Sequence, residues 1–87
     1  MKDSASLEQE LLQISQTLKA EDQYTHYKHP DRKYKIISIA FLESNEEPCV
    51  VYQALYSPYV TWIRPVSNFL EEVIIEGKKI KRFIKTN

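Results

Sequence analysis

The 87-residue chain has a single cysteine, a single glycine and no long apolar run. One thiol excludes a disulfide framework and a zinc site built from several thiolates. One glycine excludes a glycine-rich phosphate-binding loop. No window approaches the roughly 18 apolar residues of a membrane span, and the charged N-terminus lacks the apolar stretch of a signal peptide. We therefore expect a cytoplasmic protein.

An excess of charge of either sign is also missing. Twelve Lys and Arg balance twelve Asp and Glu, which excludes a strongly basic nucleic-acid binder and a polyacidic tail. The hydrophobic fraction of 43% is enough for a packed core. A chain of this length forms one core, and we expect an N-terminal helical segment over residues 1–22 and one folded domain over 23–87.

The first segment has helical periodicity. Leu7, Leu11, Ile14 and Leu18 are spaced four, three and four residues apart, which makes one apolar stripe of an amphipathic helix. Ser6 is a suitable N-cap, with Gln9 in the position of a capping box. The pattern predicts a helix over about residues 6–20. Its stripe can pack over the domain or pair with a second copy to form a homodimer, and we favour packing on the domain.

The remainder of the chain has the short alternating runs of strands. The runs cover residues 24–28, 33–42, 49–56, 61–64, 73–75 and 80–84, with turns at 29–32, 43–48, 57–59 and 76–79. Pro65 begins a single helical turn, and Gly77 suits the last turn because glycine adopts positive φ at little cost. The layout predicts a mainly β protein, a small antiparallel barrel or roll of about five strands with an added N-terminal helix.

Three stretches resemble one family. They are residues 24–28 (YTHYK) followed by Tyr34, residues 51–56 (VYQALY), and residues 62–65 (WIRP) with Phe69-Leu70 and the hairpin over 73–83. Their order and spacing are similar to those of a family of small bacterial proteins, domain of unknown function 1653. Members usually carry a glycine where this chain has His29-Pro30 and another where it has Ser57-Pro58. The resemblance implies an SH3-like barrel and brings no known reaction.

Five side chains form the principal candidate site. Trp62 and Arg64 share one face of a strand, and Tyr52 and Tyr56 share one face of the preceding strand. With His26 they would form an aromatic surface around a planar cation, which suits a carboxylate, a phosphate, a nucleobase or a peptide. Alternatively, Trp62 and one tyrosine belong to the core and Arg64 pairs with a glutamate. This site predicts a non-catalytic binding module of otherwise unknown function.

A second candidate interface is basic. Residues 77–87 contain five basic residues and no acidic ones, and residues 23–42 are also mostly basic. If these segments pair in the sheet, one face would attract nucleic acid. That function would use the C-terminal hairpin, through Lys78, Lys79, Lys81 and Arg82. Alternatively, the basic residues are solvated or pair with the acidic helix.

Signals for catalysis are weak. Cys49 opens an apolar strand, so we expect a buried, inert thiol rather than a nucleophile with His26 as its base. His26 and His29 have no third ligand at a metal-like spacing. We therefore expect no enzymatic activity, no metal and no cofactor.

Overall fold

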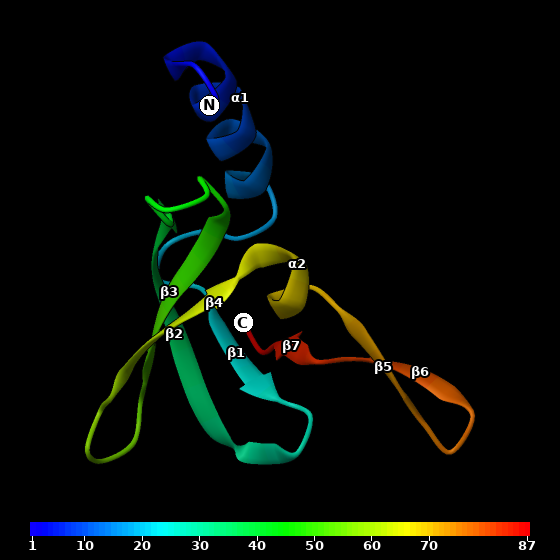
Figure 1. Cartoon of the computed structure of the whole chain (residues 1–87). Helices are drawn as coiled ribbons and strands as arrows, with labels where there is room; N and C mark the ends of the chain where they lie inside the picture. Colours follow the sequence, from blue (N-terminus) through cyan, green and yellow to red (C-terminus); the bar gives the residue numbers. More distant parts are fainter.

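The computed structural model describes residues 1–87 and contains two helices and seven strands (Figure 1). In chain order they are α1 (Ser4–Ser15), β1 (Gln23–His26), β2 (His29–Phe41), β3 (Pro48–Ala54), β4 (Thr61–Pro65), α2 (Val66–Phe69), β5 (Glu72–Ile75), β6 (Lys78–Lys81) and β7 (Phe83–Lys85). The expected mainly β architecture with an N-terminal helix is confirmed.

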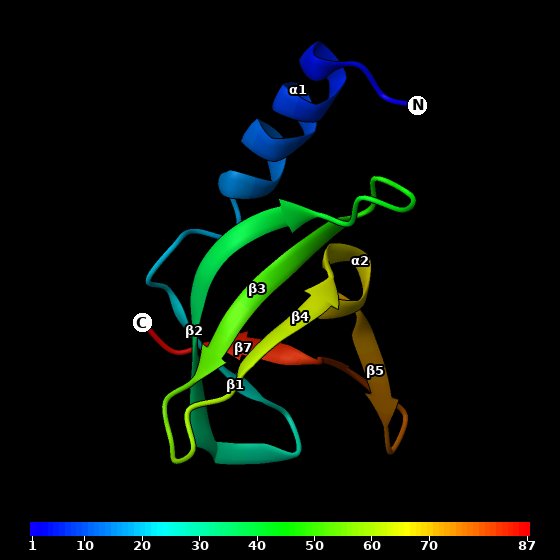
Figure 2. The ribbon, with the colours of Figure 1, turned by 60° about the vertical axis from the view of Figure 1, so that its left-hand side comes forward.

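Five strands form one antiparallel sheet in the order β4-β3-β2-β1-β7, and β5 and β6 form a separate hairpin. Figure 2 shows that the large sheet is strongly bent. It does not close into a barrel, because β4 and β7 are both edge strands with no pairing between them. The bend nevertheless brings their side chains together: the Arg64 guanidinium of β4 lies 5.2 Å from the ring centroid of Phe83 in β7.

The core lies on the inner side of the bend. It contains eight buried residues, two of which come from α2 and one from the segment after α1: Leu18, Tyr24, Ile36, Val50, Tyr52, Val66, Phe69 and Phe83. Phe69 and Phe83 stack at 4.1 Å between centroids, and Tyr24 and Tyr52 meet Phe69 edge to face. Because each aromatic side chain buries a large area, this cluster gives a short chain a hydrophobic core from few residues.

A β-bulge interrupts the expected alternation in β2. The register with β3 shifts between Ile36 and Ser38, and Ile36 then pairs with Tyr52 while Ile39 pairs with Val50. In a regular strand Ile36 and Ile39 would lie on opposite faces, but the extra residue at the bulge turns both toward the core.

The N-terminal helix begins and ends earlier than predicted. Asp3, not Ser6, is the N-cap, and its carboxylate accepts the backbone N–H of Ser6 at 2.8 Å. The helix ends at Ser15, which frees the following residues to turn toward the sheet. Leu18, only 1% exposed, then enters the core from outside the helix, with Ile14 packed against it.

Most of α1 stands away from the sheet, as Figures 1 and 2 show. None of its residues is buried, and Leu12 is 55% exposed. The contact with the core is made only by the end of the apolar stripe, through Ile14 and Leu18, while Lys2, just before the helix, donates to Glu46 in the β2–β3 loop. Neither helix of the chain is long and apolar enough to cross a membrane.

The turn predicted at residues 29–32 lies earlier, at Tyr27 and Lys28, and β2 already begins at His29. The backbone N–H of Lys28 donates to Nδ1 of His26 at 3.2 Å, which stabilises this turn. Pro30 falls where the β1–β2 register shifts, between the pairs His26–His29 and Thr25–Lys33. A proline fits such an irregularity because it has no N–H for the ladder.

The strand predicted over residues 80–84 is divided at Arg82. Residues before it belong to β6 and pair with β5, whereas residues after it belong to β7 and pair with β1. The β5–β6 hairpin projects from the body of the molecule (Figure 1). Its turn has positive φ at Glu76 (51°) and Gly77 (79°), as a two-residue type I′ hairpin requires.

Candidate binding pocket

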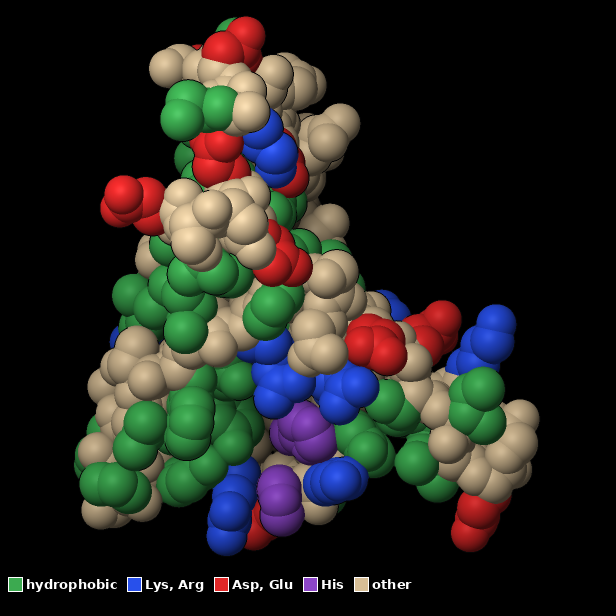
Figure 3. Space-filling model, viewed as in Figure 1, with side chains coloured by type: hydrophobic (Ala, Val, Ile, Leu, Met, Phe, Trp, Pro, Cys, Tyr) green, Lys and Arg blue, Asp and Glu red, His purple; other side chains and the backbone are tan.

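A small cavity of about 180 Å³ lies at the open side of the bent sheet. It is lined by side chains from five strands, β1, β2, β3, β4 and β7: His26, Tyr34, Tyr52, Trp62, Arg64 and Phe83. Four of the five predicted site residues are therefore together, although β1, which carries His26, is separated by β2 from β3 and β4, which carry the other three. Figure 3 shows this region as a hollow with basic and histidine side chains around it, between the sheet and the projecting hairpin.

The strand pairing places two of these side chains on one face. Trp62 lies opposite Tyr52 and Arg64 lies opposite Val50 in the β3–β4 ladder. Since Tyr52 and Val50 are core residues, the inner face of β4 carries both Trp62 and Arg64. The predicted parity of these residues is confirmed.

The Arg64 guanidinium is held by neutral groups. Its Nε donates to the Tyr52 hydroxyl at 3.3 Å, and one terminal nitrogen donates to Oδ1 of Asn68 in α2. Its cation lies over the ring of Phe83. None of the four ion pairs in the chain includes Arg64. The alternative in which Arg64 pairs with a glutamate is therefore wrong.

The nearest acidic group on the network is already engaged. Glu71 accepts from Asn68 at 3.2 Å and lies 3.5 Å from a terminal nitrogen of Arg82. Asn68 thus stands between Arg64 and Glu71. An amide in that position orients the guanidinium without neutralising its charge.

His26 lines the pocket, where its surroundings favour the neutral ring. Burial lowers its pKa from the ordinary value of 6.5, and the positive charges of Arg64, Arg82, His29 and Lys28 lower the pKa further. Because Nδ1 accepts the Lys28 N–H, we assign the proton of the neutral ring to Nε2. His26 therefore offers one N–H donor, and its ring meets Phe83 edge to face at 5.1 Å.

The alternative that Trp62 and one tyrosine belong to the core holds for the tyrosine and not for Trp62. Tyr52 is buried, as that alternative supposes, whereas Trp62 is 50% exposed at the rim of the cavity. A half-exposed indole offers a planar face to a ligand.

Tyr56 lies outside the cavity lining. Its hydroxyl makes a hydrogen bond of 2.7 Å with that of Tyr34, and the Arg32 guanidinium lies 5.3 Å from its ring centroid. Burial and the bond to Tyr56 raise the pKa of Tyr34 to about 12. Tyr56 thus supports a lining residue rather than lining the pocket itself.

Sequence reasoning missed Tyr34, Phe83 and Asn68. Tyr34 was visible within the family resemblance and could have been included for that reason. Phe83 reaches the pocket only because the chain breaks at Arg82 and β7 returns to β1, and Asn68 reaches Arg64 from α2. No local pattern indicates either arrangement.

The predicted basic interface is only partly assembled. Lys78, Lys79 and Lys81 are exposed on β6, but Glu72 lies opposite Lys81 on β5, and Glu76 is in the turn. Arg82 is half-buried and pairs with Glu71. The two basic segments do meet in the sheet, where β7 pairs with β1.

Cys49 is buried, as expected, and burial raises the pKa of its thiol. It does not line the cavity that holds His26. No group of three or more His, Cys, Asp or Glu side chains comes together in a way that could hold a metal ion.

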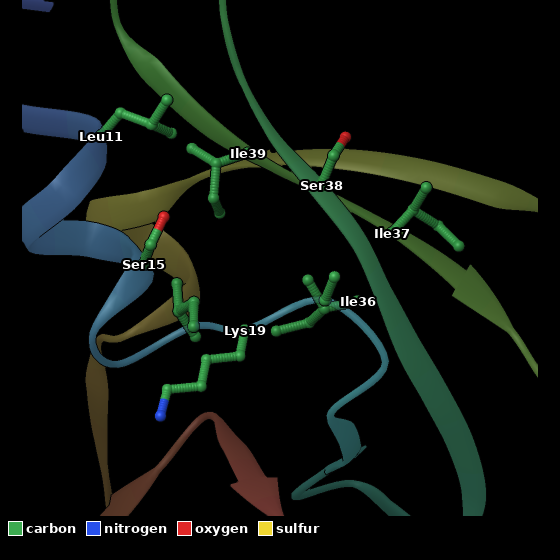
Figure 4. A pocket seen from close by; sticks show the side chains of 9 residues that line it. Leu11, Ser15, Lys19, Ile36, Ile37, Ser38 and Ile39 are labelled. Carbon is green, nitrogen blue, oxygen red and sulfur yellow. The ribbon is translucent and has the colours of Figure 1, made fainter. Parts of the chain in front are cut away.

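A groove of about 320 Å³ between α1 and β2 has a different character (Figure 4). Its walls include Leu11, Ile36 and Ile39, and its polar groups are two serine hydroxyls and the Lys19 amine, which Figure 4 shows at one end. It contains no aromatic ring and no convergent set of polar side chains, so the pocket at Arg64 is the better candidate for a ligand.

Comparison with known proteins gives one family. The model described as "Protein of unknown function (DUF1653)" matches residues 22–85. The chain belongs to the DUF1653 family. The match covers β1 to β7 and all six lining residues, and it leaves α1 outside. No curated protein and no solved structure matches this DUF1653 chain.

Proposed function

We propose that this DUF1653 protein is a small, non-catalytic binding module whose pocket holds an anionic or planar ligand against Arg64 and the surrounding aromatic rings. The observation that carries the proposal is the Arg64 guanidinium, which is positioned by Tyr52, Asn68 and Phe83 but has no carboxylate partner. Placing a cation in a partly buried site without a counter-ion is costly. An anionic ligand would supply the missing charge.

The arrangement also favours specificity. Arginine binds carboxylates and phosphates through parallel N–H donors, and its plane stacks on aromatic rings. Here the plane is fixed from three sides before any ligand arrives, which reduces the entropy lost on binding. The residues proposed to contact the ligand are His26, Tyr52, Trp62 and Arg64, with Tyr56 supporting the wall through Tyr34.

We extend the proposal to the fold and the location. The strong bend and the five-stranded sheet support an SH3-like roll that is open between β4 and β7. A cytoplasmic location is in keeping with the free thiol of Cys49, because reducing compartments preserve thiols.

The test is a titration of isotopically labelled protein with inorganic phosphate and with benzoate, followed by NMR chemical shifts. We expect one of these anions to shift the signals of His26, Trp62 and Arg64. Arg64→Ala should abolish the response and leave the fold intact. If Arg64→Ala unfolds the protein, Arg64→Lys, which keeps the charge and loses the fork, should still weaken binding. Absence of any shift at the pocket with both anions would contradict the proposal.

The alternative function is contact with nucleic acid through the β5–β6 hairpin. It is favoured by the exposed lysines of β6 on an element that projects from the body. Such binding should weaken steeply with salt. It should also be lost when Lys78, Lys79 and Lys81 are changed to Gln, whereas a pocket ligand should tolerate these changes and depend on Arg64.

A further inference from the structure

We propose that the ligand of this pocket is a nucleotide bearing a phosphate monoester, with the phosphate against Arg64 and the base on the exposed face of Trp62. The inference deepens the proposed function and rests on it. It commits to a doubly charged anion joined to a planar ring, rather than to a carboxylate or an uncharged aromatic compound.

The first reason is the amount of positive charge. Arg64 lies at the pocket without a carboxylate partner, and Lys28 adds a second positive charge that acts on His26 from the β1–β2 turn, whereas the charge of Arg82 is met by Glu71. No acidic residue lines the cavity, and Glu71 is shared between Arg82 and Asn68. A carboxylate would neutralise only one charge. A phosphate monoester carries about −1.5 to −2 charges at pH 7 and fits the excess better.

The second reason is the balance of donors and acceptors. Arg64 uses two of its five N–H groups on protein partners. The Nε2–H of His26 and the hydroxyl proton of Tyr52 are further donors, because the Tyr52 oxygen already accepts from Arg64. The pocket therefore offers many donors and few acceptors. A phosphate group has several acceptor oxygens and, as a dianion, no donor.

The third reason is the position of Trp62. It precedes Arg64 by two residues on the same face of β4, a separation of about 7 Å along a strand. That distance is similar to the space that a ribose occupies between a phosphate and its base. The cavity of about 180 Å³ accommodates a phosphate and part of a sugar, and it leaves the base at the rim, where the indole is half-exposed. Stacking of bases on aromatic side chains tolerates different bases.

Trp62 is the only tryptophan in the chain, so its fluorescence reports directly on stacking. We would titrate the full chain with AMP, adenosine, inorganic phosphate, benzoate and 3′,5′-cyclic AMP, which has the same base and only one negative charge. We expect AMP to quench the fluorescence and to bind about tenfold or more tightly than each of the others, because each lacks the base, the phosphate or the second charge.

Substitutions at Arg64 and Trp62 test whether these two side chains supply the affinity for AMP. Calorimetric titration with AMP should show a loss of about tenfold or more for Arg64→Gln and for Trp62→Leu. Trp62→Phe should recover much of the affinity because it keeps a stacking surface. Lys19→Gln is the matched control: it removes an exposed positive charge that lies outside both the pocket and the β5–β6 hairpin, and should leave the affinity unchanged.

The outcomes separate the two proposals. If benzoate binds as tightly as AMP and depends on Arg64, the nucleotide inference is wrong and the anion-binding function stands. If cyclic AMP binds as tightly as AMP, the requirement for a dianion is wrong. If no probe binds in a manner that depends on Arg64, both proposals fail. A 5′-phosphorylated dinucleotide that binds more tightly than AMP would identify the end of a nucleic-acid strand, rather than a free nucleotide, as the source of the phosphate.

Discussion

At the scale of single residues, the pocket depends on groups whose charge is set by their neighbours. Burial and nearby cations lower the pKa of His26, and a hydroxyl, an amide and a ring hold Arg64 in place. Cys49 is a buried thiol that donates weakly to the Glu47 carbonyl at 3.6 Å. Each of these groups has a measurable consequence.

The pKa of His26 leads to a prediction on stability. The folded-state pKa lies below the ordinary value of 6.5, so the unfolded chain binds more protons between the two pKa values. The free energy of unfolding should therefore fall as pH decreases through and below about 6.5. Urea unfolding between pH 7.5 and 5 should show this decline, and His26→Gln should reduce it. An unchanged pH dependence in the variant would contradict the assignment.

Cys49 should react slowly. Thiolate is the reactive form, and both burial and the charge of Glu47 raise the pKa of this thiol. We expect Ellman's reagent to modify native protein far more slowly than urea-unfolded protein. Equal rates in the two states would show that Cys49 is accessible.

At the scale of elements, α1 contributes through its C-terminal end and the residues after it. Leu18 is fully buried, and Ile14 packs against the core, whereas Leu11 on the stripe and Leu12 beside it are exposed. The apolar stripe is thus used over one part and open over another. The open part is where a homodimer, the alternative to packing on the domain, would form.

Two substitutions separate these parts. Leu18→Ala should lower the free energy of unfolding by about 2–5 kcal/mol, because it leaves a cavity in the core. Leu12→Ser should change it by about 0.5 kcal/mol or less, as expected for an exposed position. Urea unfolding of both variants tests the difference, and similar values for the two would contradict the packing of Leu18.

The homodimer has its own test. Sedimentation of the wild-type chain over a range of concentrations tests this alternative: reversible dimerisation that Leu12→Glu abolishes, by placing a charge in the apolar face, would support it. A monomer at all concentrations in the wild type would show that the open stripe of α1 has no role in self-association.

At the scale of the whole molecule, Tyr52 and Phe83 belong both to the core and to the pocket wall, and Phe83 makes the more extensive contacts. Phe83 stacks on Phe69 at 4.1 Å, meets Tyr34, Tyr52 and His26 edge to face, and supports the Arg64 guanidinium. It lies on β7, the last strand of the chain. A residue near the C-terminal end of the chain therefore belongs to both the core and the pocket wall.

Phe83→Ala should consequently weaken the core and disrupt the pocket wall. Truncation of a buried phenylalanine costs about 3–5 kcal/mol, and an 87-residue domain is stable by only about 4–13 kcal/mol. We expect a large fall in thermal stability and loss of AMP binding. Phe83→Leu should retain more stability and still weaken binding, because it removes the ring beneath Arg64. Wild-type affinity in the Leu variant would show that the ring contributes nothing to the pocket.

Local patterns in the sequence determined the elements of this protein. Helical spacing, alternating apolar residues and a single glycine in a turn predicted α1, the strands and the β5–β6 hairpin. The side-chain period of a strand placed Trp62 and Arg64 on one face. The errors arose where two signals compete locally. Asp3 and Ser6 are both good helix caps, and the turn near Pro30 was resolved by the hydrogen bond from Lys28 to His26.

Only the tertiary structure decided which partners each side chain meets. The bulge in β2, the division of the last strand at Arg82 and the return of β7 to β1 depend on pairing between residues far apart in the chain. The same pairing brings His26 and Phe83 to Arg64 and leaves the glutamates elsewhere. Periodicity reports which way a side chain points relative to its own backbone, whereas the charge and shape of a pocket come from contacts between strands.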